Sequence, residues 1–142
     1  MIEICFVCTG GTCRSFMAER IAKKMAKDKK MKGIKFSSEG LFSEEEMSSE
    51  NACQALTILG YDGKKQKSIY LKKIKPKTLY ITVTNDHKRF IKSNRVLSFE
   101  DLAGKVFDPY GRDLEAYTQS ARLIEQNIEV LLNKIENLRG DL

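Results

Sequence analysis

The feature that most constrains this chain is a run of small and polar residues, Cys-Thr-Gly-Gly-Thr-Cys-Arg-Ser, at positions 8–15. It follows an apolar run, Ile2 to Val7, that predicts a buried strand, and it precedes a predicted helix over Phe16 to Met31. A tight loop between a strand and a helix presents successive backbone N–H groups together with the positive end of the helix. The run therefore predicts an anion-binding site that contains a thiol, Cys8, and a guanidinium, Arg14.

The residue types in this run suit a phosphoryl group. Loop amides and the forked guanidinium of Arg14 can hold its three non-bridging oxygens. Cys8 would then lie below the phosphorus as an in-line nucleophile, and the positive surroundings favour the reactive thiolate. Ser15 is placed to donate a hydrogen bond to that sulfur. The nucleotide P-loop and the dinucleotide fingerprint fit less well, because the run lacks Gly-Lys-Ser/Thr and a third glycine.

The segment from Val7 to Ser15, extended by Met17-Ala18-Glu19, resembles the phosphate-binding loop of the low-molecular-weight protein tyrosine phosphatase family. The form with Thr9 and Thr12 is similar to the bacterial protein arginine phosphatase branch. The resemblance implies a catalytic Cys8 and Arg14, no cofactor and no metal. It also implies a phosphate-binding loop made of Thr9, Gly10, Gly11, Thr12, Cys13, Arg14 and Ser15.

Two positions depart from the usual family pattern. Gly11 replaces the customary asparagine, and Phe16 replaces the customary proline. Gly11 can adopt a left-handed backbone without strain but has no side chain to tie the loop together. Phe16 loses a pre-organised first helical turn. These departures leave open a non-catalytic phosphate-binding protein as an alternative.

A second motif, Asp108-Pro109-Tyr110-Gly111, predicts a loop that presents Asp108, because proline keeps the residue before it extended. The motif matches the general-acid loop of the family, whose aspartate protonates the leaving group. Here the proline is followed by one aromatic residue, Tyr110, and then by Gly111, which resembles the pattern of the arginine phosphatase branch. The resemblance implies that specificity residues include Thr12, on the loop rim, Phe42, on a neighbouring turn, and Tyr110. A compact Thr12 leaves room for a phosphoguanidinium.

The four cysteines, Cys5, Cys8, Cys13 and Cys53, do not form a secreted disulfide framework, because three fall close together. Cys5 and Cys8 have the Cys-x-x-Cys spacing of a redox pair or of half a zinc site. No second close pair completes a zinc site, and Cys5 is most simply expected in the core. Cys8 and Cys13 form a candidate redox pair, like that of some family members, with loop packing as the equal alternative for Cys13. Arsenate reductase activity is a less favoured alternative. The arsenate reductases of this fold need further cysteines downstream to relay the disulfide, and only Cys53 follows Cys13.

Composition predicts a soluble globular protein, with 42% hydrophobic and 31% charged residues. No apolar run approaches the ~20 residues of a membrane span, and Glu3 with no basic flank argues against a signal peptide. We therefore expect a cytoplasmic location and no membrane partner. The net charge of +6 is attributed to solvated lysine-rich faces, and no nucleic-acid partner is expected. The lone His87 is given no catalytic role.

Hydrophobic periodicity and turn signals predict further strands and helices in alternation. Strands are expected at Ile34 to Ser38, Thr78 to Thr84 and Arg95 to Leu97, and the last of these is followed by chain that is expected to be irregular. Helices are expected from Ser48 or Ser49 to Gly60, over Ser68 to Lys75, from Asn85, and from Arg112 or Asp113 to Leu138.

Alternating strands and helices predict an α/β fold with a parallel sheet covered on both faces. The family resemblance implies a four-stranded, doubly wound sheet in one phosphatase domain spanning residues 1–142. It implies a cysteine-dependent phosphatase that hydrolyses phosphoarginine on proteins through a cysteinyl-phosphate. Phosphotyrosine is the alternative substrate. The oligomeric state stays open.

Overall fold

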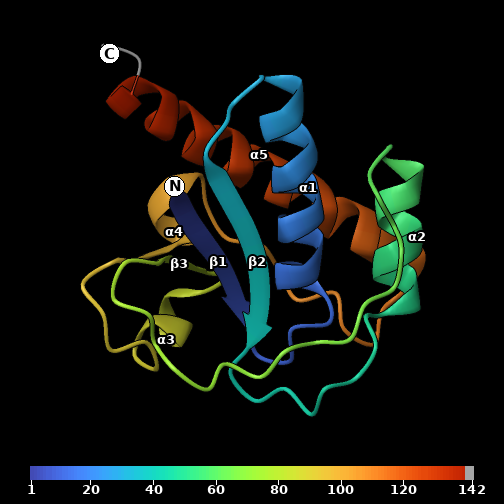
Figure 1. The fold of residues 1–142 in the computed structure, drawn as a ribbon. Helices are drawn as coiled ribbons and strands as arrows, with labels where there is room; N and C mark the ends of the chain where they lie inside the picture. The colour runs from blue at the N-terminus through green and yellow to red at the C-terminus, as the bar shows by residue number, and fades with distance from the viewer. Residues whose placement is uncertain (140–142) are drawn as a thin grey trace.

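The computed structural model describes residues 1–139 and contains a four-stranded parallel sheet in the order β2-β1-β3-β4. The strands are β1 (Ile2–Cys8), β2 (Ile34–Gly40), β3 (Leu79–Thr82) and β4 (Val96–Ser98). The register of β1 and β2 pairs Ile2 with Ile34 and Cys8 with Gly40. The carboxyl ends of these strands therefore lie side by side, and Figure 1 shows loops gathered at that end. The predicted parallel α/β sheet is confirmed.

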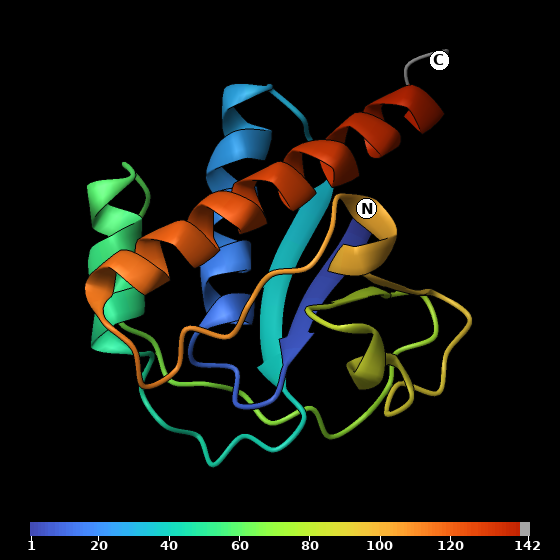
Figure 2. The same cartoon turned by 180° about the vertical axis from the view of Figure 1, so that it is seen from behind.

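Five helices connect or follow the strands in the described residues. They are α1 (Arg14–Asp28), α2 (Glu50–Ile58), α3 (Asn85–Lys88), α4 (Phe99–Leu102) and α5 (Leu114–Arg139). The long helix α5 packs against α1 and α2, and in Figure 2 it runs in front of the sheet. None of the helices within residues 1–139 is both long and apolar enough to cross a membrane.

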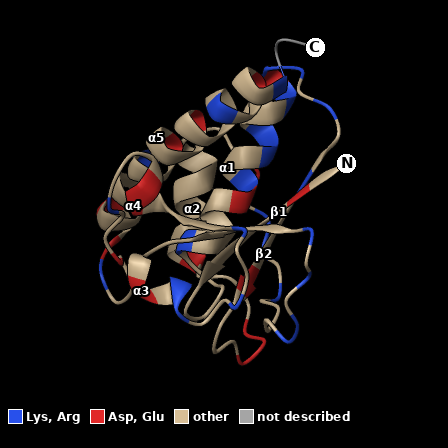
Figure 3. Ribbon diagram, turned by 90° about the vertical axis from the view of Figure 1, so that its left-hand side faces the viewer, with Lys and Arg blue, Asp and Glu red and all other residues tan. Residues whose placement is uncertain are grey.

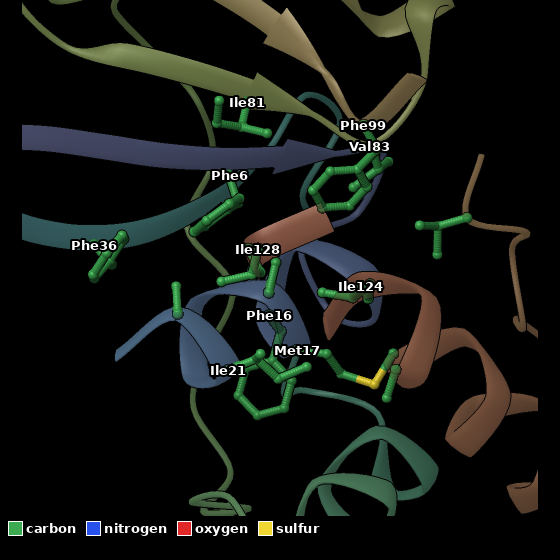
Figure 4. Packing of buried hydrophobic residues seen from close by; sticks show 14 of the residues in the cluster. Phe6, Phe16, Met17, Ile21, Phe36, Ile81, Val83, Phe99, Ile124 and Ile128 are labelled. Atoms are coloured by element: carbon green, nitrogen blue, oxygen red, sulfur yellow. The ribbon is translucent and has the colours of Figure 1, made fainter. Parts of the chain in front are cut away.

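The main core lies between one face of the sheet and helices α1 and α5. Its side chains come from alternate positions of β1, because successive strand residues point to opposite faces. Figure 4 shows Phe6 of β1 packing toward Met17 and Ile21 of α1 and toward Ile124 and Ile128 of α5. Phe16 is also fully buried here, which contributes about 2 kcal/mol of stability. This packing explains why phenylalanine is accepted at the first turn of α1.

The other sheet face carries a smaller core of Cys5, Val7, Leu41, Leu71, Tyr80 and Ile91. Extended chain after α2 supplies Leu71, and the segment after α3 supplies Ile91. The prediction of a short helix over Ser68 to Lys75 is wrong. Tyr70 instead forms a parallel bridge with Gly40, whose N–H donates to the Ile69 carbonyl at 2.8 Å. The segment around Tyr70 therefore pairs with Gly40 at the end of β2 instead of forming a helix.

The element boundaries differ slightly from those predicted. Helix α1 starts at Arg14 rather than Phe16 and ends at Asp28 rather than Met31, since Lys30 adopts a left-handed backbone with φ of 57°. Helix α4 lies where the sequence predicted irregular chain. It is held by a reciprocal capping box between Ser98 and Asp101.

Candidate active site

The predicted site residues meet around a cavity of about 290 Å³ at the carboxyl end of β1. The loop between β1 and α1 forms its floor. The chain after β2 and the segment before α5 form its walls. Its lining residues are Cys8, Thr9, Gly10, Thr12, Cys13, Arg14, Phe42, Glu44, Glu46, Asp108 and Tyr110. Gly11 and Ser15, also predicted for the loop, lie behind this lining and contact the Cys8 sulfur.

The Cys8 side chain is buried and receives two polar contacts at its sulfur. The Oγ atom of Ser15 lies 2.9 Å from Sγ, and the N–H of Gly11 donates to Sγ at 3.2 Å. A thiolate accepts hydrogen bonds and donates none, so in that form the Ser15 hydroxyl must be the donor. The two donors stabilise a negative charge on the sulfur.

The N-terminus of α1 adds to the positive potential of the floor. Cys13 is the N-cap residue, and no side chain caps this end of the helix. The first turn also contains no acidic residue. The unpaired N–H groups of this 15-residue helix, together with the loop amides, are therefore available to an anion.

The Arg14 guanidinium is buried and fixed against the segment before α5. Its Nη1 donates to the Val106 carbonyl at 3.0 Å, and its Nη2 lies 3.6 Å from Oδ2 of Asp108. One edge of the guanidinium therefore anchors to the backbone, and the other faces a carboxylate. An oxyanion entering the cavity would compete with Asp108 for Nη2, because both carry negative charge.

Asp108 is presented on a loop, as the Asp-Pro motif predicts. Its side chain is 57% exposed, and its Oδ1 accepts a hydrogen bond from the Tyr110 N–H at 3.0 Å. This local turn orients the carboxyl group, while Pro109 is buried beneath it. The second carboxyl oxygen points to Arg14 at the cavity wall.

The loop keeps its shape through close backbone packing rather than through the side chain of residue 11. Gly11 has a φ of 75°, which glycine adopts without strain. Gly40 lies against it, and a Cβ atom at Gly40 would come within 2.5 Å of the Gly10 carbonyl carbon. The Leu41 and Phe42 N–H groups donate to the carbonyls of Cys8 and Thr9, at 2.9 and 2.8 Å.

The three predicted specificity residues all line the cavity. Thr12 is half-buried at its rim, whereas the side chains of Phe42 and Tyr110 are 60% and 77% exposed. Leu41, which precedes Phe42, is instead buried in the core on the second sheet face. Phe42 and Tyr110 thus provide two aromatic surfaces at the entrance.

Several residues at the site carry no sequence signal that would identify them. His87, at the start of α3, contacts the Thr9 hydroxyl through Nε2 at 3.0 Å. Burial, and then the nearby Arg14 charge, lower the pKa of His87, so the ring is neutral near pH 7. Tyr117 of α5 lies 3.6 Å from the Cys13 sulfur. Both contacts join segments far apart in the sequence.

The sequence does not identify Glu44 and Glu46 as site residues either, since an acidic loop usually indicates only a solvated surface. Both lie in the chain between β2 and α2, and both line the cavity. Figure 3 shows acidic residues on the loop below the end of β2. Together with Asp108 they place three carboxylates around a cavity whose single lining cation is Arg14.

All four cysteines are free and buried. Cys5 packs in the core on the second face, as expected, and burial raises the pKa of its thiol to about 12. Cys5 and Cys8 therefore lie on opposite sheet faces and do not form a pair. Burial also raises the pKa of Cys13. Cys53 lies in α2 beside Ser48, 3.5 Å from its hydroxyl, and does not line the cavity.

The described residues contain no group of three or more His, Cys, Asp or Glu side chains placed to hold a metal ion. The positive groups at the cavity are the Arg14 guanidinium, the loop amides and the end of α1. These groups belong to the chain itself. Such positive groups can bind a tetrahedral oxyanion, and the Cys8 sulfur and the Asp108 carboxyl group lie at the same cavity.

Proteins similar to this chain include some named as tyrosine phosphatases and some named as arginine phosphatases. The chain is 30% identical to the low molecular weight protein-tyrosine-phosphatase PtpB of Staphylococcus aureus, over 84% of this chain and 88% of that protein. It is 28% identical to the protein-arginine-phosphatase of Bacillus subtilis, over 97% and 99%. The structure of the YwlE arginine phosphatase from Geobacillus stearothermophilus matches with a TM-score of 0.87 at 28% identity, covering 99% of this chain and 97% of that one.

A family profile gives the broader assignment. The profile described as low molecular weight phosphotyrosine protein phosphatase matches residues 3–140, which is nearly the whole chain. The match includes the β1–α1 loop, the Asp108 segment and the sheet between them. The chain belongs to the low molecular weight phosphotyrosine protein phosphatase family.

Proposed function

We propose that this phosphatase hydrolyses phosphoarginine on proteins through a cysteinyl-phosphate intermediate. The observation that carries the proposal is the Cys8 sulfur, held by Ser15 and Gly11 in a cavity that also contains Arg14 and Asp108. A nucleophile, an oxyanion site and an acid in one cavity are the three components of phosphoryl transfer to an enzyme side chain.

In the first step the phosphoryl oxygens bind to Arg14 Nη2, the loop amides and the N-terminus of α1. The Cys8 thiolate attacks phosphorus, and a P–S bond forms as the P–N bond of the substrate breaks. The electron pair of the P–N bond passes to the guanidine nitrogen, which takes a proton from the carboxyl group of Asp108. Arginine leaves as the guanidinium cation, because the phosphoguanidinium already carries one positive charge before it takes the proton.

In the second step the Asp108 carboxylate removes a proton from water as the water oxygen attacks the phosphorus. The P–S bond breaks and its electron pair returns to Cys8 as thiolate. Ser15 and Gly11 stabilise this leaving group through the same two hydrogen bonds that they make in the resting state. Inorganic phosphate leaves, Asp108 releases its proton to water, and the resulting carboxylate pairs with Arg14 again.

The cavity lining supports a guanidinium substrate. A phosphorylated guanidine group retains N–H donors, which carboxylates accept, whereas a phenyl ring has none. Asp108, Glu44 and Glu46 supply such acceptors around the cavity. The compact Thr12 at the rim leaves room for a branched planar group. The protein-arginine-phosphatase of B. subtilis is a relative along nearly the whole chain.

Phosphotyrosine is the second candidate substrate, and the entrance supports it. Phe42 and Tyr110 are exposed aromatic residues that line the cavity and can stack on a phenol ring. The S. aureus relative is named as a protein-tyrosine-phosphatase. Planar guanidinium groups also stack on aromatic faces, so these two residues do not by themselves separate the substrates.

A direct comparison of two phosphopeptides with the same sequence tests the proposal. One carries phosphoarginine and the other phosphotyrosine at the same position, and phosphate release gives kcat/KM for each. We expect phosphoarginine to be favoured by about tenfold or more, and Thr12→Ile to reduce that preference by filling the rim. A clear preference of the wild-type enzyme for phosphotyrosine would contradict the phosphoarginine assignment. Thr118→Val, at a half-buried position of α5 outside the cavity lining, is the matched control and should leave the preference unchanged.

A further inference from the structure

A second cavity, of about 260 Å³, lies beside the active site and shares one wall with it. Phe42 lines both cavities. We call the second one the aromatic–lysine groove and define it by Phe42, Tyr70, Lys72, Lys73, Ile74 and Phe90. The phosphatase mechanism uses none of these side chains except Phe42, which stands at the boundary.

The groove contains an unusual amount of exposed aromatic surface. Phe42, Tyr70 and Phe90 are 60%, 42% and 46% exposed, although each comes from a different connecting segment. The Phe42 and Phe90 rings meet edge to face, with centroids 5.5 Å apart. Adjoining exposed aromatic side chains of this kind are typical of surfaces that bind another polypeptide.

The charge around the groove is positive and unpaired. Within the described residues, neither Lys72 nor Lys73 takes part in an ion pair, although both are exposed. The Arg89 guanidinium lies 5.2 Å from the centre of the Phe90 ring and also has no carboxylate partner in residues 1–139. An acidic polypeptide would complement these three cations.

The backbone beneath the groove is fixed before any partner binds. Tyr70 pairs with Gly40 in a parallel bridge, and the Leu71 N–H donates to the Gly40 carbonyl at 3.0 Å. The Leu71 side chain is buried in the core of the second sheet face. Gly40 also packs against the β1–α1 loop. A preformed groove lowers the entropy cost of binding and keeps it in fixed register with Cys8.

We propose that the aromatic–lysine groove binds the substrate polypeptide next to its phosphorylated residue, and that it selects an apolar side chain accompanied by acidic residues. The proposal rests on the proposed phosphatase function, because it places the phosphorylated residue in the Cys8 cavity. Phe42 would contact both the phosphorylated side chain and the flanking chain. The groove thereby adds a sequence preference that the small anion site alone does not provide.

Peptides that differ only in their flanks test this inference. One phosphopeptide carries Leu-Asp-Asp about two to four residues before the phosphorylated residue, and a second carries it at the same distance after that residue. For each of the two, a partner peptide carries Ser-Lys-Lys at the same place. The variant Lys72→Glu/Lys73→Glu reverses the groove charge, and Lys64→Glu/Lys65→Glu makes the same charge change outside the groove.

We expect the wild-type enzyme to favour the acidic peptide on at least one side by about tenfold in kcat/KM, mainly through KM. The groove variant should lose this preference and keep its rate on a small aryl phosphate, and the control variant should keep both. An unchanged preference in the groove variant, or an equal loss in the control, would overturn the proposal.

Binding measurements separate this proposal from the proposed function. Peptide affinity is measured by fluorescence anisotropy in a Cys8→Ser background, where no hydrolysis is needed. If the wild-type enzyme hydrolyses nothing, the proposed function fails, yet a weaker affinity in the groove variant would still support the groove. Equal affinities would overturn it. A single-stranded oligonucleotide that competes as well as the acidic peptide would also overturn it, because the groove would then be a general anion surface.

Discussion

The Sγ atom of Cys8 lies 2.9 Å from the Oγ atom of Ser15, at the floor of the active-site cavity. Ser15 is fully buried in the first turn of α1, so its hydroxyl is fixed by the helix that follows the loop. The hydrogen bond therefore connects the sulfur directly to the element that helps to bind the phosphate. In the proposed mechanism it stabilises the thiolate both before attack and when the cysteinyl-phosphate breaks down.

Replacing Ser15 by alanine should lower kcat by about ten- to hundredfold, because a hydrogen bond to a charged group is worth about 1.5–3 kcal/mol. Alkylation of Cys8 by iodoacetamide at pH 7 should also slow. Steady-state kinetics and mass spectrometry of the alkylated peptide measure the two effects. Ser93→Ala, in the connection before β4, is the matched control and should change neither value. Wild-type kinetics in the Ser15 variant would remove this residue from the mechanism.

Gly40 packs against the β1–α1 loop from the neighbouring strand and limits where that loop can lie. An alanine there would place its Cβ 2.5 Å from the Gly10 carbonyl carbon, a distance at which the backbone must move. We expect Gly40→Ala to displace the loop and lower kcat/KM by about a hundredfold or more, since misplacement by about 1 Å has that effect. Phosphate release measures the loss. Circular dichroism should show the folded sheet, and full activity would contradict the packing described here.

Acid should destabilise the protein partly through His87. Burial and Arg14 lower the pKa of this histidine below its ordinary value of 6.5, so the unfolded chain binds the proton more readily than the folded one. The contribution is present above pH 6.5 and is lost as the pH falls through the folded-state pKa. His87→Gln keeps a polar group near Thr9 without this titration. Urea unfolding at pH 7 and pH 5 should show a smaller acid loss in the variant.

We propose that Cys13 protects Cys8 from irreversible oxidation by forming a disulfide. Both thiols are free in the structure, and Cys13 contacts Tyr117 and Thr12. Peroxide should inactivate the wild-type enzyme in a way that dithiothreitol reverses, whereas Cys13→Ser should be inactivated permanently. Activity recovered after reduction is the measurement. Equal recovery in both proteins would favour the packing role for Cys13.

The sequence predicts the parallel sheet and the position of the phosphate-binding loop because both depend on local patterns. The apolar run before Cys8 and the periodicity of α5 are strong signals of this kind. Asp108 could be proposed because proline and glycine constrain its loop. The extended chain at Tyr70 could not be predicted, because it depends on pairing with Gly40, a contact between distant segments.

The same limit applies to the active site. Ser15 is close to Cys8 in the sequence, so its contact follows from the geometry of the loop and helix. His87 and Tyr117 reach the loop only through the folding of α3 and α5. Glu44 and Glu46 belong to an acidic turn whose composition indicates a solvated surface. Their place at the cavity follows from the direction in which the chain leaves β2.

The most direct test of the account is to trap the phosphorylated enzyme by rapid acid quench and identify the modified residue by mass spectrometry. With a phosphoarginine peptide as substrate, the account predicts a phosphate on Cys8 that appears and decays at rates consistent with kcat. Asp108→Asn should form this species more slowly from phosphoarginine, and Cys8→Ser should release no phosphate above background. Normal turnover by Cys8→Ser, or a phosphate found on another residue, would contradict the account.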